Sequence, residues 1–332
     1  ERDRDGNPTG TLHEGAMTLV TDHVPVTDAA EMYRGLLAGQ AYLHSFGVTS
    51  WQDAIVGSYA GSDDNGPTYA RAARAGDLTA TVVGALWWDR ERGLEQIPDL
   101  VARREELSFG RFSATTIKIM QDGVIENGTA GVVEPYLDSS GHPTGNAGLS
   151  FVDPAGLRAY VAELDALGFQ VHVHGLGDRG VREALDAFEG TNPDRRHHIA
   201  HLQLVHPDDV ARFARLGVSA NIQALWACLD DQMVDLTIPF LGESRARRQY
   251  PFGDLHRAGA HIVAGSDWPV STPDPLQAVH VAVNRVHHGS DLPPFLPEQA
   301  LDLATALTAY TADSAYVNRL DDSGTLRPGN RA

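Results

Sequence analysis

Four short apolar runs in this sequence end in side chains that can bind a metal ion or move a proton. They are Lys118 in TTIKIMQDG, His174 in FQVHVHGLGD, His201 in RHHIAHLQLVH and Asp267 in HIVAGSDWPV. Imidazoles and carboxylates are ligands of Zn²⁺ and similar divalent ions, and such an ion with one open position lowers the pKa of bound water toward ~7. These residues therefore predict a metal-dependent hydrolase in which Asp267 is both a ligand and the catalytic proton carrier.

Lys118 needs a separate explanation, because an ammonium ion repels a metal ion. Burial on a strand disfavours the charged form of a lysine, and a neutral amine combines with carbon dioxide to give a carbamate. The carbamate is anionic and can bridge metal ions. We therefore predict a carbamylated Lys118 that helps to hold one or two divalent ions, with zinc as the expected metal.

Each of these residues also has a purely structural interpretation. A lysine in an alternating strand commonly points to solvent, and single histidines are commonly hydrogen-bonded in the core or at the surface. Asp267 could cap a helix before Pro269. The shared position at strand ends favours the metal site. His172 and His198 are expected to pack or to support the ligands, and the only cysteine, Cys228, is expected to be inert.

Helices and strands that could position these residues alternate along the chain. Helical spacing of apolar residues predicts helices over residues 28–45, 68–75, 93–107, 154–167, 179–189, 207–216 and 250–258, with a helical tail from residue 275 onward. Apolar runs predict seven strands, over residues 47–54, 78–88, 114–123, 169–175, 197–204, 218–223 and 261–267. A Gly- and Pro-rich excursion over residues 123–148 interrupts the alternation.

Apolar strands joined by helices predict a parallel sheet that is covered on both faces or closed into a barrel. The predicted fold is an α/β barrel of the (β/α)8 TIM type, with its first strand missing from this chain. Chemistry in such barrels lies at the C-terminal ends of the strands, where the four candidate ligands fall. A doubly wound sheet is the alternative, but its only phosphate-loop candidate, GLGDRG from Gly175, is a weak match.

The net charge, the apolar stretches and the cysteine count of the chain exclude some binding partners and cellular compartments. A net charge of -18 over 332 residues repels nucleic acid and anionic membrane surfaces, and no apolar stretch is long enough to cross a bilayer. A single cysteine excludes an internal disulfide and favours a cytoplasmic location. The charged start without Met and the abrupt end suggest a piece of a longer chain.

Several strings resemble the amidohydrolase superfamily, and within it amidohydrolase family 3, the YtcJ-like and N-substituted formamide deformylase-like proteins. They extend over nearly the whole chain: DGNPTGTLHEGAM, GVTSWQDA, IKIMQDGVIENGTA, HVHGLGDRGVREALDAFE, RHHIAHLQLVHPDD, VSANIQ, AGAHIVAGSDWPVSTPDPLQAV and SGTLRPGNRA. The resemblance implies a (β/α)8 barrel whose metal is held by an HxH pair on the first strand, a carbamylated lysine on the fourth, histidines on the fifth and sixth, and an aspartate on the eighth. Carried over to this sequence, the last four ligands are Lys118, His174, His201 and Asp267.

The HxH pair of the first strand has no counterpart before Lys118. The one His-x-His string, from His172 to His174, follows the lysine and matches the fifth strand. The family also has a small β-sandwich built from both chain ends. We therefore predict three parts: residues 1–27 as a remnant of an N-terminal or inserted region, residues 28–317 as the barrel, and residues 318–332 as the start of the return to the sandwich.

The predicted function is hydrolysis of a non-peptide C–N bond, in an N-substituted amide or formamide, by metal-activated water. Substrate contacts are expected from Asp122, Gln223, Trp226, Arg248 and Trp268. A lactonase or phosphoesterase on the same barrel is an alternative, since fold alone does not choose the reaction. A further alternative is an inactive fragment or binding subunit that lacks the HxH pair. The expected partner is a small-molecule substrate, and homodimer formation is left open.

Overall fold

Seven parallel strands form the centre of the computed structural model, which describes residues 2, 5–21, 23–59 and 61–331. The strands are β1 (Ser50–Val56), β2 (Thr81–Trp87), β3 (Phe112–Met120), β4 (Gln170–Gly175), β5 (His198–His201), β6 (Ser219–Ile222) and β7 (Ile262–Ala264). They lie side by side in chain order, and every neighbouring pair is parallel. This confirms the predicted sheet. A doubly wound sheet reverses its strand order, so the sequential order is that of a barrel.

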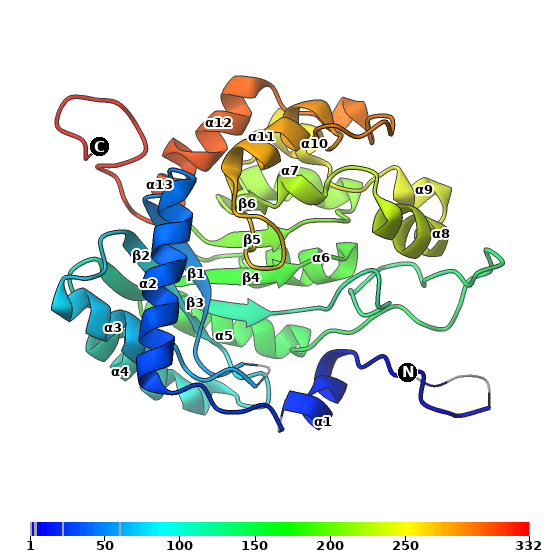
Figure 1. Ribbon diagram of the computed structural model, residues 1–332. Helices are drawn as coiled ribbons and strands as arrows, with labels where there is room; N and C mark the ends of the chain where they lie inside the picture. Colours follow the sequence, from blue (N-terminus) through cyan, green and yellow to red (C-terminus); the bar gives the residue numbers. More distant parts are fainter. Residues whose placement is uncertain (1, 3–4, 22, 60, 332) are drawn as a thin grey trace.

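Helices connect the consecutive strands, as the alternating pattern predicts. They are α2 (Ala29–Ser45) before β1, then α3 (Gly66–Ala75), α4 (Ile97–Leu107), α5 (Pro154–Ala166), α6 (Asp178–Ala187), α7 (Pro207–Leu216) and α10 (Phe252–Arg257). Three more follow β7 and lie together beyond β6 in Figure 1: α11 (Pro275–Asn284), α12 (Leu303–Tyr310) and α13 (Ala312–Val317). Asp28 caps α2, because its carboxylate accepts from the N–H groups of Ala30 and Glu31 at 2.8 and 2.7 Å.

The strands next to the candidate ligands carry apolar side chains on one face and polar side chains on the other. The apolar positions of β3 and β4 are fully buried in the main core: Ile117, Ile119, Val171 and Val173. The alternate positions hold Lys118, His172 and His174. Because successive side chains of a strand point to opposite faces, the apolar set packs under the helices while the polar set lines the inside of the curl.

The sheet curls into a half-barrel whose edges are β1 and β7. Among the residues that the structure describes, no backbone pairing joins β1 to β7. Helix α2 packs against α3 near this edge. The parallel arrangement brings the C-terminal ends of all seven strands to one rim, which is where a barrel places its functional groups.

Residues 121–153, between β3 and α5, contain no helix or strand. This confirms the irregular excursion predicted over residues 123–148, and the segment extends away from the sheet in Figure 1. It is anchored by a small core of its own, in which Ile125, Val132 and Tyr136 pack with Leu204 and Leu241.

Residues 224–246 fold into short helical turns that the sequence pattern did not predict. They are η4 (Ala224–Trp226), the π-helical turn η5 (Met233–Thr237), α8 (Ile238–Leu241) and α9 (Glu243–Ala246). Each spans only three to five residues, which is too short to display a helical period.

The chain ends hold few regular elements. Residues 1–27 contain the turn η1 (Glu14–Met17) and the short helix α1 (Thr18–Thr21), while positions 1, 3, 4 and 22 lie outside the described residues. No helix or strand occurs in the described residues 318–331, and position 332 is also outside them. The division at residues 27 and 317 stays a prediction. No helix in the described part of the chain has the length and apolar character needed to cross a membrane.

Candidate metal centre

Lys118 is the only lysine in the sequence, and only 5% of its surface is exposed. It lies on β3 in register with His172 on β4, and its Nζ is 2.9 Å from His172 Nε2. Burial lowers the pKa of Lys118 to about 8, although the nearby charge of Asp267 acts in the opposite direction. A large fraction of the amine is therefore neutral near pH 8, which is the form that carbamate chemistry requires.

His174 and His201 lie beside each other at the ends of β4 and β5. Their rings meet edge to face with centroids 4.4 Å apart, and both side chains are buried. Burial, followed by the charges of His174 and Lys118, holds the pKa of His201 well below its usual range, so this imidazole is neutral. Its Nδ1 is buried without a hydrogen-bond partner in the described structure. A neutral imidazole nitrogen with a free lone pair is a metal donor.

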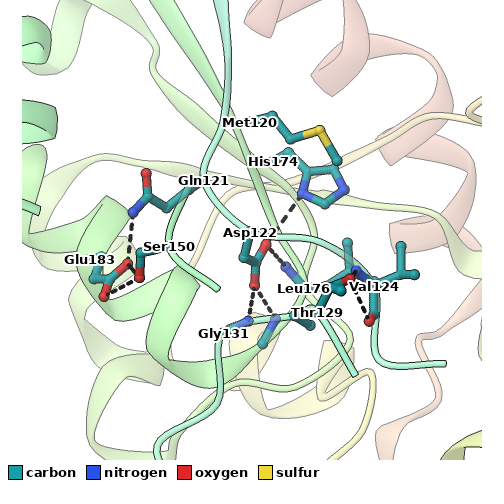
Figure 2. Close-up of polar contacts among 12 residues, drawn as sticks. Met120, Gln121, Asp122, Val124, Thr129, Gly131, Ser150, His174, Leu176 and Glu183 are labelled. Carbon is teal, nitrogen blue, oxygen red and sulfur yellow. Dashed lines mark hydrogen bonds and ion pairs between the residues drawn. The ribbon is translucent and has the colours of Figure 1, made fainter. Parts of the chain in front are cut away.

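Asp122 fixes the orientation of His174, as Figure 2 shows. Its Oδ1 accepts hydrogen bonds from His174 Nδ1 at 3.3 Å and from the N–H of Leu176 at 3.0 Å. Its Oδ2 accepts from the N–H groups of Gly131 at 3.0 Å and Gly177 at 2.8 Å. With the hydrogen on Nδ1, His174 keeps the lone pair of Nε2 for a ligand bond. Both oxygens of Asp122 are thus engaged within the chain, and its predicted contact with substrate stays a prediction.

Two of the predicted ligands have a strained backbone. The φ angle is +82° at His201 and +54° at Asp267, in the left-handed region that side chains other than glycine rarely adopt. Such residues cost of the order of 1–3 kcal/mol each and cluster at functional sites. The strain at these two positions therefore supports a functional role for the ends of β5 and β7.

Gln223 and Trp226 lie next to His201, as expected for residues of one site. Gln223 Nε2 donates to Asn221 Oδ1 at 3.0 Å, and Gln223 Oε1 is buried without a hydrogen-bond partner in the described structure. The ring of Trp226 is stacked with that of His201, with centroids 5.7 Å apart and an interplanar angle of 16°. Trp226 therefore covers one face of the unpartnered imidazole.

Arg248 and Trp268 have their contacts elsewhere. Arg248 Nη2 donates to Ser244 Oγ at 3.4 Å. Trp268 is 39% exposed and packs on Tyr42 of α2, with ring centroids 5.8 Å apart. Within the described residues, no hydrogen bond or ring contact joins either side chain to Lys118 or to the two histidine ligands. Their roles in substrate binding stay predictions.

The sequence interpretation missed the layer beneath the ligands. His172 bonds directly to Lys118, a more specific role than the packing or support expected of it. Gln52 on β1 was not predicted at all, although its Oε1 lies 2.7 Å from His172 Nδ1. The composition could have indicated a special environment for Lys118, because the chain has 25 arginines and only one lysine. Arginine carries the positive charge of the surface, so a lone lysine on an apolar strand points to a specific chemical role.

The donors present fit part of a metal shell. In the described chain, no three His, Cys, Asp or Glu side chains are grouped as a complete metal site. The His174 and His201 pair nevertheless offers two imidazole donors, one of them with an orphaned nitrogen. Two imidazole donors fit part of the shell of a divalent ion.

Comparison with known proteins agrees with this geometry. The sequence profile described as "Amidohydrolase family" matches residues 1–332. The Arabidopsis thaliana protein LONG AFTER FAR-RED 3 is 29% identical, over 98% of this chain and 56% of that protein. The N-substituted formamide deformylase of Arthrobacter pascens is 25% identical, over 100% of this chain and 60% of that enzyme.

A solved structure extends the comparison to the fold. An uncharacterized metal-dependent hydrolase from Pyrococcus furiosus superposes with a TM-score of 0.75 at 25% identity, covering 96% of this chain and 61% of that one. This chain thus spans little more than half the length of these relatives. The superposition agrees with the seven parallel strands in barrel order that this chain forms. The chain belongs to the amidohydrolase family.

Proposed function

We propose that this chain carries the metal-binding rim of a hydrolase that cleaves a non-peptide C–N bond in an N-substituted amide or formamide. The observation that carries the proposal is the pair of buried imidazoles, His174 and His201, with a free nitrogen on His201. Membership of the amidohydrolase family and similarity to an N-substituted formamide deformylase support the choice of bond.

Four residues would hold the divalent ion: Lys118, His174, His201 and Asp267. Zinc is proposed because it prefers imidazole and carboxylate donors, and when bound it would activate water at neutral pH. Lys118 contributes as a carbamate. Its Nζ lone pair attacks the carbon of carbon dioxide, an N–C bond forms, and one N–H proton leaves to solvent, so the side chain gains one negative charge.

Asp267 is proposed as the proton carrier of the reaction. Its carboxylate takes a proton from the attacking water and delivers it to the leaving amine. Trp226 shields one face of the His201 ring from bulk water. The proposal includes a small-molecule substrate and a cytoplasmic location, and it leaves homodimer formation open. The acidic net charge disfavours nucleic acid and anionic membranes as partners, and the single cysteine is typical of a reducing compartment.

A substrate panel tests the reaction. Zinc-loaded protein is offered N-substituted formamides, simple amides, lactones and phosphotriesters, and the initial rates are compared. We expect the formamides to be hydrolysed fastest, and Asp267→Asn to lower kcat by about 10²–10⁴-fold, the size of a general acid–base contribution. Asp138→Asn is the matched control, because that exposed carboxylate accepts from the N–H groups of Ser140 and His142 in its own turn.

Two other outcomes would replace this proposal. Faster turnover of lactones or phosphotriesters, lost in Asp267→Asn, would assign ester chemistry to the same rim. Zinc binding without turnover of any compound would favour a binding subunit.

A further inference from the structure

A chain of buried and half-buried polar side chains runs through the inside of the half-barrel and ends at Lys118. It begins at Gln170, the first residue of β4, which is only 3% exposed. The Nε2 of Gln170 donates to two backbone carbonyls, that of Arg196 at 2.7 Å and that of Val317 at 2.6 Å. A carbonyl oxygen can only accept a hydrogen bond, so the amide of Gln170 has one allowed orientation.

The orientation of Gln170 determines that of Gln52. Because Gln170 Oε1 must accept, the atom of Gln52 that lies 3.1 Å from it must be the amide nitrogen. The same nitrogen donates to Asn318 Oδ1 at 3.0 Å. Asn318 is fixed in turn, since its own Nδ2 donates to the carbonyl of Ser314 at 2.9 Å. Two independent anchors therefore leave Gln52 Oε1 as an acceptor.

The orientation of Gln52 determines the tautomer of His172. Gln52 Oε1 lies 2.7 Å from His172 Nδ1, so Nδ1 carries the hydrogen. A neutral imidazole with a hydrogen on Nδ1 has its lone pair on Nε2. The ammonium form of Lys118 has only donors, so it requires the same lone pair on Nε2. His172 Nε2 therefore accepts from Lys118 Nζ at 2.9 Å.

We infer that His172 is a positioning residue for Lys118: held by Gln52 in the Nδ1–H form, it binds one hydrogen of Nζ and so sets the direction in which that nitrogen faces the rim. An amine and an ammonium both donate to His172 Nε2, so the geometry does not depend on the charge of the lysine. A carbamate nitrogen keeps one N–H, and the same hydrogen bond would serve it. The role of this bond in holding a carbamate rests on the proposed function. The sequence of hydrogen bonds from Gln170 to Lys118 does not depend on that function.

The single lysine makes the inference directly measurable. The chain is labelled with ¹⁵N-lysine and ¹⁵N-histidine and studied by NMR without added metal, and one side-chain signal reports Lys118. We expect His172 to show a protonated Nδ1 and an unprotonated Nε2 in at least about a tenfold excess over the other tautomer, which corresponds to 1.4 kcal/mol. A His172 ring protonated at Nε2 in the unmodified chain would overturn the inference, and this measurement needs no variant.

Two variants test whether Gln52 orients His172 and, through it, Lys118, or whether any change in packing has the same effect. Gln52→Met removes the acceptor at Nδ1, so we expect the tautomer excess of His172 to fall and the ¹⁵Nζ signal of Lys118 to shift. Thr116→Val is the matched control. It removes a buried hydrogen bond to Gln170 Oε1, of 2.8 Å, but leaves the two carbonyl anchors of that amide in place. An unchanged Lys118 signal in Gln52→Met, or an equal shift in Thr116→Val, would contradict the positioning of Lys118 by Gln52 and His172.

The result is separable from that of the proposed function. If His172 has the expected tautomer but the chain hydrolyses nothing, the proposed reaction fails and the positioning role stands. If the chain hydrolyses a formamide but His172 is protonated at Nε2, the reaction stands and the positioning role fails.

Discussion

Asp122 shows how a single residue connects the excursion, the turn after β4 and a candidate ligand. Three backbone N–H groups and one imidazole donate to its two oxygens, and none of its surface is exposed. A sequence pattern can place an aspartate after a strand, as it did here. It cannot show which donors converge on that aspartate, because they come from residues 131 and 174–177, which are separate along the chain.

The first prediction concerns the stability that these bonds provide. Asp122→Asn replaces one acceptor oxygen by an NH2 group, so buried N–H donors lose their partner at about 1–3 kcal/mol each. We expect the free energy of unfolding, measured by urea denaturation, to fall by about 2–4 kcal/mol. Asp138→Asn is the control, since that exposed carboxylate also accepts two backbone N–H bonds. Equal losses in the two variants would contradict the role of burial.

The second prediction concerns His198, which lies beneath the ligands. Burial, followed by the charges of Lys118 and His197, lowers its pKa to about 3. The unfolded chain therefore binds more protons below pH ~6.5, so stability is present above that pH and is lost as the pH falls toward the folded pKa. Between pH 7 and 5 this residue alone should remove about 2 kcal/mol.

Urea denaturation at both pH values measures this loss. His198→Asn should show a loss smaller by about that amount, while the exposed His142→Asn should behave as the unmodified chain. An equal loss of unfolding free energy between pH 7 and 5 in all three proteins would contradict the lowered pKa of His198.

At the scale of elements, the strands and long helices could be predicted, whereas the short turns could not. Every strand of the sheet overlaps an apolar run. The inner strands β2, β4 and β5 are mostly buried, whereas the edge strand β1 is only partly buried. The four turns within residues 224–246 have no periodicity to read, and they are stabilised by contacts with the excursion. One such contact is the hydrogen bond from Leu137 N–H to the carbonyl of Phe240, of 2.8 Å.

The third prediction tests how tightly the excursion packs on the turn between β4 and α6. A Cβ at Gly177 would lie 2.2 Å from the carbonyl oxygen of Gly131, closer than any real contact. Gly177→Ala should therefore lower the free energy of unfolding by about 2–3 kcal/mol through overpacking. Gly35→Ala, in an exposed position of α2 with open space around it, should raise it by about 0.5–1 kcal/mol. Thermal unfolding of both variants measures the contrast, and a stabilised Gly177→Ala would refute the close approach.

At the scale of the whole molecule, the parallel sheet brings the C-terminal ends of the strands that carry or precede the four candidate ligands to one rim. Lys118, His174, His201 and Asp267 come from four different strands or strand ends, and the sequence strings around them were enough to predict the family. The ligand set stays a prediction. Their partners were not predictable, because the pairing of Lys118 with His172 depends on the register between β3 and β4. That register is set by the packing of the whole sheet, and one strand alone does not reveal it.

Zinc affinity of the metal-free chain, measured by competition with a chromophoric chelator, tests the central claim most directly. We predict a measurable affinity that falls by about tenfold or more in each of Lys118→Ala, His174→Ala and His201→Ala, and that is unchanged in the exposed His142→Ala. A chain that binds no zinc, or one whose affinity is the same in all four variants, would contradict the assignment of a metal centre to this rim.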